Sequence, residues 1–446
     1  MRAVYFLLML GASLPTLGEV PAFKFYRWNE DYSVMKGDVD PNWYEKLKYA
    51  PLAGSAYFSL GGTLRQRLNL YENDRFGLFG EPDGYLRLGR LLLHADLHLN
   101  DRARVFVELG SHNVDGEDLR PGPFDEDRGD VTQAFVDLSV LQSRLRLGRQ
   151  EMKLGSTRLL GVRDGPNVRR AFDGARVDTA WDDIDLRFFA LYEVDVNEGW
   201  WDNEHNEDEA FWGAYGSWTL SWTNAEFYYL GLDRAGARYS QGTADETRHS
   251  FGARLFGSRD AWDWNYEFVY QDGSFGGDDI RAWTAASITG FTIADHPWRP
   301  RVSVSANVAS GDDDPLDNTL GTFNPLYPNL MYFEEAAVLA PQNFVNVEPE
   351  ITVHPSSAVS LSLDWNFFWR LEKNDGVYVR GLLPLPGTAA VDGSFVAHVP
   401  SLSVDVQLNR YLAVDVSYSH FFAGEVIDNA DGDDIDFFKL ELTLTF

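Results

Sequence analysis

The chain has 446 residues, and its 38 lysines and arginines stand against 68 aspartates and glutamates, which gives a formal net charge of −30. So acidic a chain is not expected to bind nucleic acid, because proteins that do so usually have a basic surface. The 30 Phe, 20 Tyr and 14 Trp residues argue against disorder, and the absence of cysteine excludes disulfides, zinc thiolate sites and cysteine nucleophiles.

The first 18 residues have the pattern of a secretory signal peptide. Arg2 supplies a positive charge, Ala3–Leu10 is an apolar run, and small residues with the helix-breaking Pro15 follow. We expect cleavage near Gly18. No later stretch has the roughly 18 uninterrupted apolar residues that a membrane-spanning helix needs. The sequence therefore predicts either a soluble exported protein or an outer-membrane barrel.

Residues 19–55 are mixed in character, and we expect an N-terminal periplasmic segment with a short helix around Trp43 to Tyr49. Residues 56–446 are dominated by alternation of apolar and polar residues, which is the period of a β-strand. In the last strand the apolar residues from Phe438 to Phe446 share one face. An aromatic residue that closes such a strand resembles the assembly signal of outer-membrane proteins, although an ordinary amphipathic strand has the same pattern.

Alternation is also typical of a soluble β-sandwich, so the connections decide between the two. Short turns alternate with long polar loops, as tight periplasmic turns and long extracellular loops do in outer-membrane barrels. Counting strands across these connections predicts an all-β fold, a transmembrane antiparallel β-barrel of about 18 strands. The long loops are expected at residues 73–83, 112–129, 155–172, 194–209, 233–247, 271–279, 310–342, 370–394 and 423–434.

In such a barrel the apolar faces meet lipid and the polar faces line an aqueous lumen. Guanidinium groups bind carboxylates bidentately, so a ladder of lumenal arginines is suited to passing an acidic sugar chain from site to site. The predicted pore-lining arginines are Arg65, Arg67, Arg90, Arg104, Arg146, Arg149, Arg176, Arg187, Arg254, Arg281, Arg301 and Arg370.

Two points about these arginines stay open at the level of sequence. Each arginine is also compatible with simple pairing to an acid on a neighbouring strand, which would only stiffen the wall. Strict alternation puts Arg149 on the lipid face, so either a bulge redirects it or its side chain snorkels to the interface. The acids predicted to face the lumen are Asp96, Glu108, Asp137, Asp178 and Asp185.

The loop Gly155–Phe172 is basic in an otherwise acidic chain and is external by its place in the loop order. We expect it to fold inward as a constriction. The alternative is that it stays outside and binds phosphates of lipopolysaccharide. The candidate constriction residues are Arg158, Arg163, Arg169 and Arg170.

Few residues suggest a metal or a catalytic site. His94, Asp96 and His98 share one strand face at a spacing that suits zinc, but no fourth ligand is evident. The acidic loops 311–314 and 428–436 are compatible with Ca²⁺, and solvated loops or divalent bridging to lipid phosphates account for them as well. Motifs of hydrolases, metalloproteases and phosphate-binding loops are absent, so we expect no metal site, no cofactor and no enzyme activity.

Several phrases resemble the alginate-export porin family of Gram-negative bacteria. They occur in order between Tyr57 and Phe446: GYLRLGRLLLHADLHL, DEDRGDVTQAFVDL, RLRLGRQEMKLGSTRLLGVRDGPNVRRAFDGARV, RAWTAAS, ASGDDDPLDNTLGTFNPLYP and VSYSHFFAGEVI. The resemblance implies a monomeric 18-stranded barrel with an arginine-rich constriction, which exports the polyuronate alginate beside periplasmic and inner-membrane synthesis machinery. Carried over motif by motif, it implies wall arginines at Arg90, Arg104, Arg146, Arg149 and Arg176.

The expected function is that of an outer-membrane porin that passes an anionic polysaccharide, with alginate export as the first expectation. An uptake porin for small carboxylates or acidic oligosaccharides is the second, and an outer-membrane enzyme is the third. The expected partners are outer-membrane lipid, lipopolysaccharide, the anionic polysaccharide and periplasmic export machinery, without nucleic acid and with the protein as a monomer. A passive pore has no transport direction of its own, so the sequence does not distinguish export from uptake.

Overall fold

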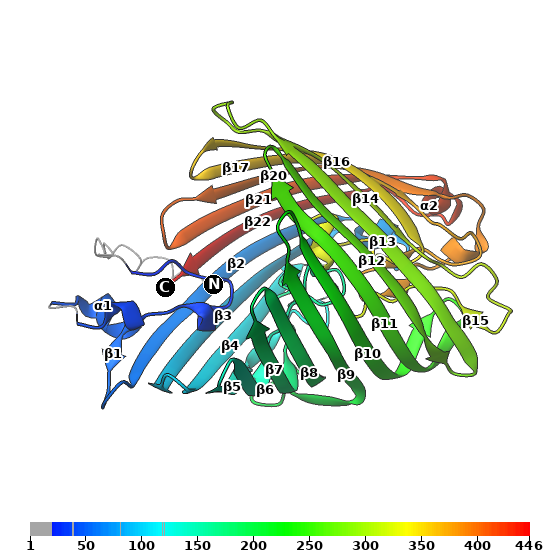
Figure 1. The fold of residues 1–446 in the computed structure, drawn as a ribbon. Helices are drawn as coiled ribbons and strands as arrows, with labels where there is room; N and C mark the ends of the chain where they lie inside the picture. The colour runs from blue at the N-terminus through cyan, green and yellow to red at the C-terminus, as the bar shows by residue number, and fades with distance from the viewer. Residues whose placement is uncertain (1–19, 38–39, 81, 118, 120) are drawn as a thin grey trace.

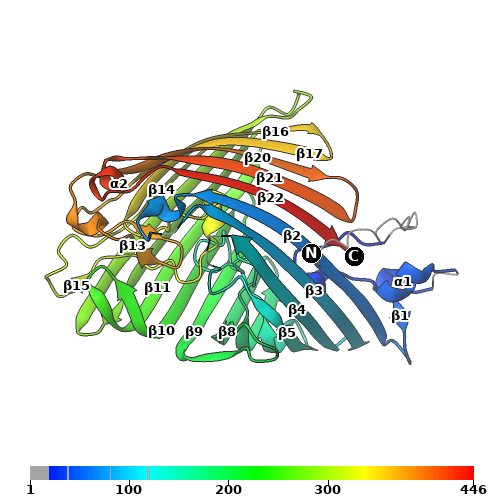
Figure 2. The same ribbon diagram turned by 180° about the vertical axis from the view of Figure 1, so that it is seen from behind.

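In a computed structural model of the protein, the structure describes residues 20–37, 40–80, 82–117, 119 and 121–446. The expected signal peptide, residues 1–18, lies outside the described residues. Eighteen antiparallel strands are hydrogen-bonded in chain order, and the last strand pairs with the first from Thr63↔Thr445 to Glu72↔Asp436. The fold is therefore a closed 18-stranded antiparallel β-barrel, which confirms the expected fold class (Figures 1 and 2).

Most strands of the barrel have 11 residues or more, and β6, β7 and β14, with 8, 10 and 9 residues, are the short ones. Their bounds are β2 (Tyr57–Glu72), β3 (Gly84–Asn100), β4 (Ala103–Glu117), β5 (Asp127–Val140), β6 (Ser143–Gln150), β7 (Phe172–Trp181), β8 (Ile184–Asp195), β9 (Glu204–Thr219), β10 (Asn224–Tyr239), β11 (Gly242–Arg259), β12 (Trp262–Phe275), β13 (Asp278–Thr292), β14 (Arg301–Ala309), β16 (Phe344–Ser356), β17 (Val359–Trp369), β20 (Phe395–Gln407), β21 (Leu412–Ala423) and β22 (Ile435–Thr445).

Among the described residues no helix is long and apolar enough to cross a membrane. The remaining elements are short and lie in the N-terminal segment and in the connections between the barrel strands. They are η2 (Arg27–Asn29), η3 (Ser33–Met35), α1 (Trp43–Lys48), β1 (Ala50–Pro51), η4 (Asp74–Gly77), β15 (Thr319–Leu320), η5 (Leu330–Tyr332), β18 (Tyr378–Val379), β19 (Leu383–Pro384), η6 (Thr388–Ala390) and α2 (Glu425–Asn429).

Helix α1 forms where the sequence predicts a short helix, because its first turn is capped. The Asn42 side chain accepts hydrogen bonds from the backbone N–H groups of Tyr44 and Glu45, at 2.9 and 3.1 Å. The Glu45 carboxylate in turn accepts from the Asn42 N–H at 2.8 Å, which completes a capping box.

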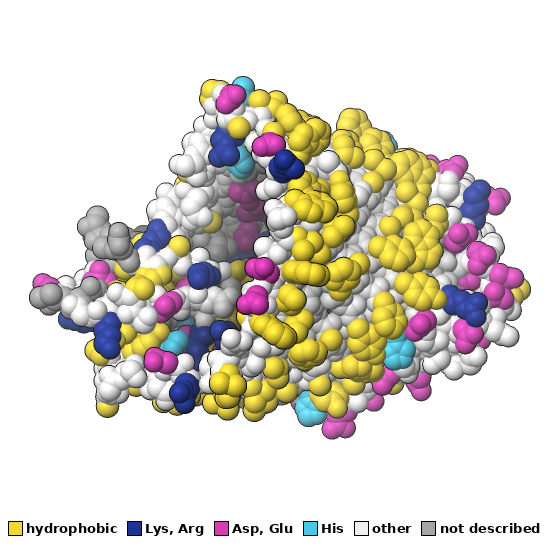
Figure 3. Space-filling model, viewed as in Figure 1, with side chains coloured by type: hydrophobic (Ala, Val, Ile, Leu, Met, Phe, Trp, Pro, Cys, Tyr) yellow, Lys and Arg dark blue, Asp and Glu magenta, His cyan; other side chains and the backbone are white. Residues whose placement is uncertain are grey.

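The two faces of each strand follow the alternation of the sequence. The outer face carries exposed apolar side chains such as Phe188, Phe227, Leu363 and Trp365, which are 46–58% exposed. Figure 3 shows hydrophobic side chains as a broad band across the face in view, with charged side chains gathered toward the two ends of the barrel. A band of this kind is what a lipid-facing surface requires.

Two of the expected long loops are instead tight turns. Strands β10 and β11 continue through residues 233–247 and are joined at Ser240 and Gln241, and β12 and β13 are joined at Gly276 and Gly277. The prediction of loops at 233–247 and 271–279 was therefore wrong. These polar residues continue the strands as hairpins beyond the lipid-facing band. At that level outward polar side chains do not contact lipid, so a polar sequence is compatible with a strand.

The buried core of the protein lies inside the barrel. Residues of three long connections, together with η4 and α2, pack against lumenal side chains of β7 to β14, β16, β17 and β20 to β22 and form one apolar cluster. Its members include Leu160, Phe323, Tyr327, Val338 and Tyr378. Much of the lumen at the loop end of the barrel is therefore filled by the loops themselves.

Candidate functional site

The lumenal wall carries most of the predicted arginines, and several of them pair with acids of the same or an adjacent strand. The pairs are bidentate where the geometry allows, as in Arg104 with Asp96 at 2.6 and 2.7 Å and Arg146 with Asp137 at 2.7 and 2.8 Å. Two further pairs of adjacent strands are Arg254–Glu226 at 2.7 Å and Arg67–Glu441 at 2.6 Å, and Arg301 on β14 reaches Asp263 on β12 at 2.7 Å. For these residues the simple pairing interpretation describes the contacts that the structure contains.

Arg176 and Arg187 differ from these pairs, because both contact the same carboxylate. Arg176 Nε lies 2.9 Å from one oxygen of Asp178, and Arg187 Nε lies 2.5 Å from the other. Two guanidinium charges facing one carboxylate leave a local excess of positive charge. Arg144, on the same lumenal face of β6 and exposed, has no ion pair within the described residues.

Arg67 and two other wall arginines bind the connection between β6 and β7, which we call the basic loop (residues 151–171). Arg65 donates to the carbonyl oxygens of Asp164 and Pro166 at 2.8 and 3.2 Å. Arg90 donates to the same two carbonyls, to the Asp164 carboxylate at 2.6 Å and to the Asn167 carbonyl at 2.7 Å. Arg67 donates to the Gly165 carbonyl. These contacts with lumenal side chains place the basic loop inside the barrel.

The four candidate constriction residues are ion-paired and largely buried inside the barrel. Arg158 lies 3.0 Å from Glu267 on β12, and Arg169 lies 2.6 Å from Asp164 within the loop. Arg163 and Arg170 share Glu193 of β8, at 3.3 and 2.8 Å. Whether these residues limit conduction stays a prediction.

The electrostatics of the basic loop reflect its burial. Burial raises the pKa of Glu151 to about 8, with Arg169 acting in the opposite direction, so this carboxyl is largely protonated at neutral pH. Burial, and the neighbouring charge of Arg170 after it, lowers the pKa of Arg163 to about 9. At neutral pH Arg163 keeps its charge while Glu151 is largely neutral, so the loop in place carries a more positive net charge than its sequence suggests.

A second connection, which we call the aromatic loop (residues 310–343), also enters the lumen, and sequence reasoning missed it. Tyr327 packs edge-on against Phe172 and Phe211 of the wall, with ring centroids 5.2 and 4.9 Å apart. Glu335 contacts Lys439 of β22. The available signal was the aromatic and apolar run FNPLYPNLMYF, residues 323–333, which an exposed loop would not need.

Three of the arginines predicted to line the pore do not do so. Arg149 points outward and binds Asp173 at 2.9 Å, beneath residues 196–203, which cross the outside of the barrel. Strict alternation therefore placed Arg149 correctly. The position carried over from the family motif was wrong. Arg281 is exposed at 68% on the outer face beside Asp279, because it shares the phase of the lipid-facing Trp283.

Arg370 lies beyond the end of β17 and belongs to a loop. Its guanidinium donates to the carbonyl oxygens of Gly393 at 2.8 Å and Thr388 at 2.5 Å, and to that of Val391. All three nitrogens are thus occupied in holding the connection between β17 and β20, so the prediction that Arg370 lines the pore was wrong.

The predicted lumenal acids lie on the lumenal phase of their strands. Asp96, Asp137 and Asp178 are the arginine partners described above, and Glu108 accepts a hydrogen bond from Gln133 at 2.9 Å. Asp185 borders a cavity at the end of the barrel that carries the short turns. Their part in transport stays a prediction.

This cavity has a volume of about 660 Å³ and is bordered by the turn between β5 and β6 and by the ends of β7 and β8. Four basic residues line it, Arg144, Lys153, Arg176 and Arg187, together with three acids. The acids are Asp178, Asp185 and Glu226. Tyr26, Trp28 and Asn29 of the N-terminal segment (residues 20–49) complete its lining, which the sequence did not indicate.

The opposite part of the wall is acidic. Lumenal positions of β16, β17, β20 and β21 carry Glu348, Glu350, Asp364, Asp405 and Asp415. Figure 3 shows acidic side chains in the hollow at the end of the barrel where the termini lie. The described part of the lumen is thus basic on the side of β6 to β8 and acidic on the side of β16 to β21.

Among the described residues no group of three or more His, Asp or Glu side chains is arranged to hold a metal ion. His94 and His98 do not converge with a further ligand. In the acidic loop 311–314, Asp312 accepts backbone hydrogen bonds from Asp314 and Gly321, each at 3.1 Å, so its carboxylate has partners within the protein.

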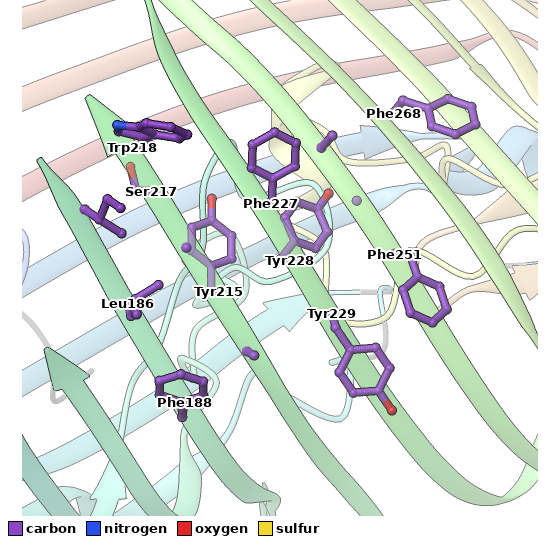
Figure 4. A pocket seen from close by; sticks show the side chains of 15 residues that line it. Leu186, Phe188, Tyr215, Ser217, Trp218, Phe227, Tyr228, Tyr229, Phe251 and Phe268 are labelled. Carbon is purple, nitrogen blue, oxygen red and sulfur yellow. The ribbon is translucent and has the colours of Figure 1, made fainter. Parts of the chain in front are cut away.

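A further hollow lies on the outer face of the barrel and is lined almost entirely by apolar atoms. Figure 4 shows Phe188, Phe227, Tyr229, Phe251 and Phe268 around it, on neighbouring strands of the wall. Because small residues at the same level leave space between these rings, the hollow is a furrow in the lipid-facing surface and not a part of the lumen.

The comparisons with known proteins agree with this geometry. The family model described as Alginate export matches residues 56–439. This chain belongs to the alginate-export family. Together with the closed barrel, the family makes it a porin of the Gram-negative outer membrane. The comparison with curated proteins finds no match.

Solved structures of Pseudomonas aeruginosa porins share the fold of this alginate-export family member. OpdQ is 13% identical with a TM-score of 0.60, covering 87% of this chain and 98% of that one. OccK11 (OpdR) is 12% identical with a TM-score of 0.59, covering 87% and 96%. OccK2 (OpdF), solved in complex with glucuronate, is 10% identical with a TM-score of 0.58, covering 87% and 98%. At these identities the likeness concerns the fold alone.

Proposed function

We propose that this porin conducts acidic saccharides, with alginate, the polyuronate in the family's name, as the first candidate. The observation that carries the proposal is the pair Arg176 and Arg187, which face one cavity and share the single carboxylate of Asp178. Arg144 and Lys153 line the same cavity without an ion pair in the described residues. A guanidinium whose acid partner is shared retains donors for a passing carboxylate.

In the proposed mechanism, transport is passive. A uronate carboxylate exchanges between neighbouring basic groups of the cavity, and nearby Asp178, Asp185 and Glu226 keep each contact weak enough to release. We propose no catalytic step. The protein acts as a monomer in outer-membrane lipid and lipopolysaccharide. If it exports its solute, it works beside periplasmic machinery. Residues 1–18 serve as a signal peptide, and residues 19–55 form a segment that precedes the barrel.

A second candidate is uptake of small carboxylates or acidic oligosaccharides. A cavity of about 660 Å³ matches a ligand of one or a few sugar units, since small-molecule sites measure about 300–1,000 Å³. The basic and aromatic loops fill much of the lumen at the loop end, so a threaded polymer requires both to move. Glucuronate, named for the OccK2 complex, is a suitable small probe.

The test is conductance in planar bilayers. We expect the wild-type channel to be blocked by glucuronate and by oligomeric alginate, and not by glucose. The variant Arg176→Gln with Arg187→Gln should weaken block about a hundredfold or more, because it removes two charge-assisted hydrogen-bond donors worth roughly 1.5–3 kcal/mol each.

Arg281→Gln is the matched control, because Arg281 lies on the outer surface and should leave block unchanged. Absence of a channel, or a channel blocked equally by glucose and glucuronate, overturns the proposal. Block by glucuronate without block by alginate oligomers favours the uptake candidate.

A further inference from the structure

The N-terminal segment enters the mouth of the barrel at the end with the short turns. Trp28 is 4% exposed and packs edge-on against Phe106 and Phe135, with ring centroids 5.7 and 5.3 Å apart. Both phenylalanines lie on the lumenal face, on β4 and β5. A segment that precedes the barrel in the chain therefore lies inside it.

Charged groups fasten this segment at two points. Arg27 pairs with Glu30 at 2.6 Å and donates to the carbonyls of Gly62 and Phe446 at 3.0 and 3.1 Å, at the seam where β2 meets β22. The guanidinium of Arg146, itself buried, lies 4.7 Å from the centre of the Trp28 ring. Arg104 donates to the Trp28 carbonyl. The segment is thus seated on the wall arginines of β4 and β6.

Tyr26 stacks on the side of Trp28 that remains free, with ring centroids 4.2 Å apart and an interplanar angle of 18°. Both residues line the cavity that contains Arg176 and Arg187. Lys153 of the basic loop lies 5.5 Å from the Tyr26 ring and 4.1 Å from that of Phe25. The cavity thus combines an aromatic wall with an excess of basic groups.

We propose that Tyr26, held by Trp28, is a sugar-binding element of the pore, against which the ring of a uronate rests while its carboxylate meets Arg176 and Arg187. The proposal rests on the proposed function and adds to it a residue outside the barrel. Aromatic side chains that line a cavity beside a few convergent polar groups are the usual composition of a small-molecule site. Trp28 is a positioning residue, since it is buried beneath Tyr26.

The arrangement assigns separate tasks to the two kinds of group. The guanidinium groups select the charge of the solute, whereas the aromatic wall selects a flat apolar face such as the C–H face of a pyranose. A small carboxylate without a ring uses only the first. The inference therefore predicts a preference for uronates over acyclic carboxylates of equal charge.

The experiment compares block of single channels by glucuronate and by acetate in wild type, Tyr26→Ala, Tyr26→Phe and Trp43→Ala. We expect Tyr26→Ala to weaken glucuronate block about three- to tenfold and to leave acetate block unchanged, because an aromatic contact is worth about 0.5–1.5 kcal/mol. Tyr26→Phe should keep wild-type block, since the Tyr26 hydroxyl has no hydrogen-bond partner in the described residues. Trp43→Ala is the matched control, an aromatic residue of the same segment that is 60% exposed.

Three outcomes overturn the inference. If Tyr26→Ala raises conductance while glucuronate block is unchanged, the segment is only a plug, and the proposed function stands. If glucuronate and acetate block weaken equally, the ring has no role of its own. If wild type is not blocked by glucuronate at all, the proposed function fails together with this subsite. Heat-dependent migration of each variant in detergent gels verifies that its barrel is folded.

Discussion

At the scale of single residues, contacts decide which charges are available to a solute. Arg146 and Arg176 are neighbours across β6 and β7 with the same phase, and the sequence treats them alike. Arg146 is fully buried against the Phe135 ring and paired with Asp137, whereas Arg176 faces the cavity and shares its acid. Substitution of Arg176 should therefore affect selectivity, while substitution of Arg146 should affect mainly stability.

Lys48 gives a prediction at the same scale. Its ammonium group is buried, donates to the Leu60 carbonyl at 2.8 Å and lies 5.4 Å from the ring centres of Tyr32 and Tyr44. Burial, and then the charge of Arg27, lowers the pKa of Lys48 from 10.5 to about 7. Between pH 7 and pH 10.5, Lys48 is protonated in the detached segment and neutral in the docked one. Docking of the segment should therefore strengthen as pH rises through this range, and its strength should not change with pH below about 7.

The measurement is protection of the N-terminal segment from protease in detergent micelles, at pH 7 and at pH 9, below the pH at which exposed tyrosines ionise. Burial raises the pKa of Tyr32 and Tyr44, the two rings that face the ammonium group, so both keep their protons in the docked segment through this window. Lys48→Met should abolish the pH dependence. Protection that increases as pH falls would show that another group controls docking.

At the scale of elements, the basic loop shows how the wall and a connection hold each other. Four donor contacts from Arg90 and three from Arg65 end on the loop within residues 164–167. Arg90 is only 2% exposed, so its charge depends on these acceptors. Strands β6 and β7 are short, which brings the start of this loop low enough in the barrel to reach β2 and β3.

We predict that Arg90→Met weakens attachment of the basic loop by roughly 3–5 kcal/mol, because it breaks a buried, hydrogen-bonded charge cluster. The expected readout is a larger mean conductance with frequent open–closed fluctuations in single-channel records. Arg87→Met on the same strand is the control, because Arg87 is exposed on the outer face and stacks on Tyr85. Unchanged conductance and noise in Arg90→Met would mean that the loop does not limit the ion path.

At the scale of the whole molecule, the lumen has two electrostatic sides. The strands β6 to β8 present Arg144, Arg176 and Arg187, and the strands β16 and β17 opposite present Glu348, Glu350 and Asp364. Opposite charges on facing walls produce an electric field across the lumen. This field orients a solute as well as selecting its charge. The negative formal charge of the chain therefore does not prevent a local site for anions.

We predict that Glu348→Gln with Asp364→Asn shifts the reversal potential in a salt gradient at pH 9 toward anion selectivity, because both acids are ionised at that pH and neither has an ion-pair partner within the described residues. Asp279→Asn, an exposed acid of the outer face, should leave it unchanged. A shift toward cation selectivity, or none, would place the acidic side outside the ion path.

The sequence by itself determined the barrel, its approximate number of strands and the face on which most arginines lie, because a period of two assigns each residue to lipid or lumen without reference to distant contacts. It also indicated the inward basic loop through its charge. The tertiary structure alone decided that Arg149 is covered by residues 196–203, that Arg65 and Arg90 are occupied by loop carbonyls, and that Tyr26 and the aromatic loop lie in the lumen. These are contacts between segments far apart in the chain, and local periodicity contains no information about where such segments meet.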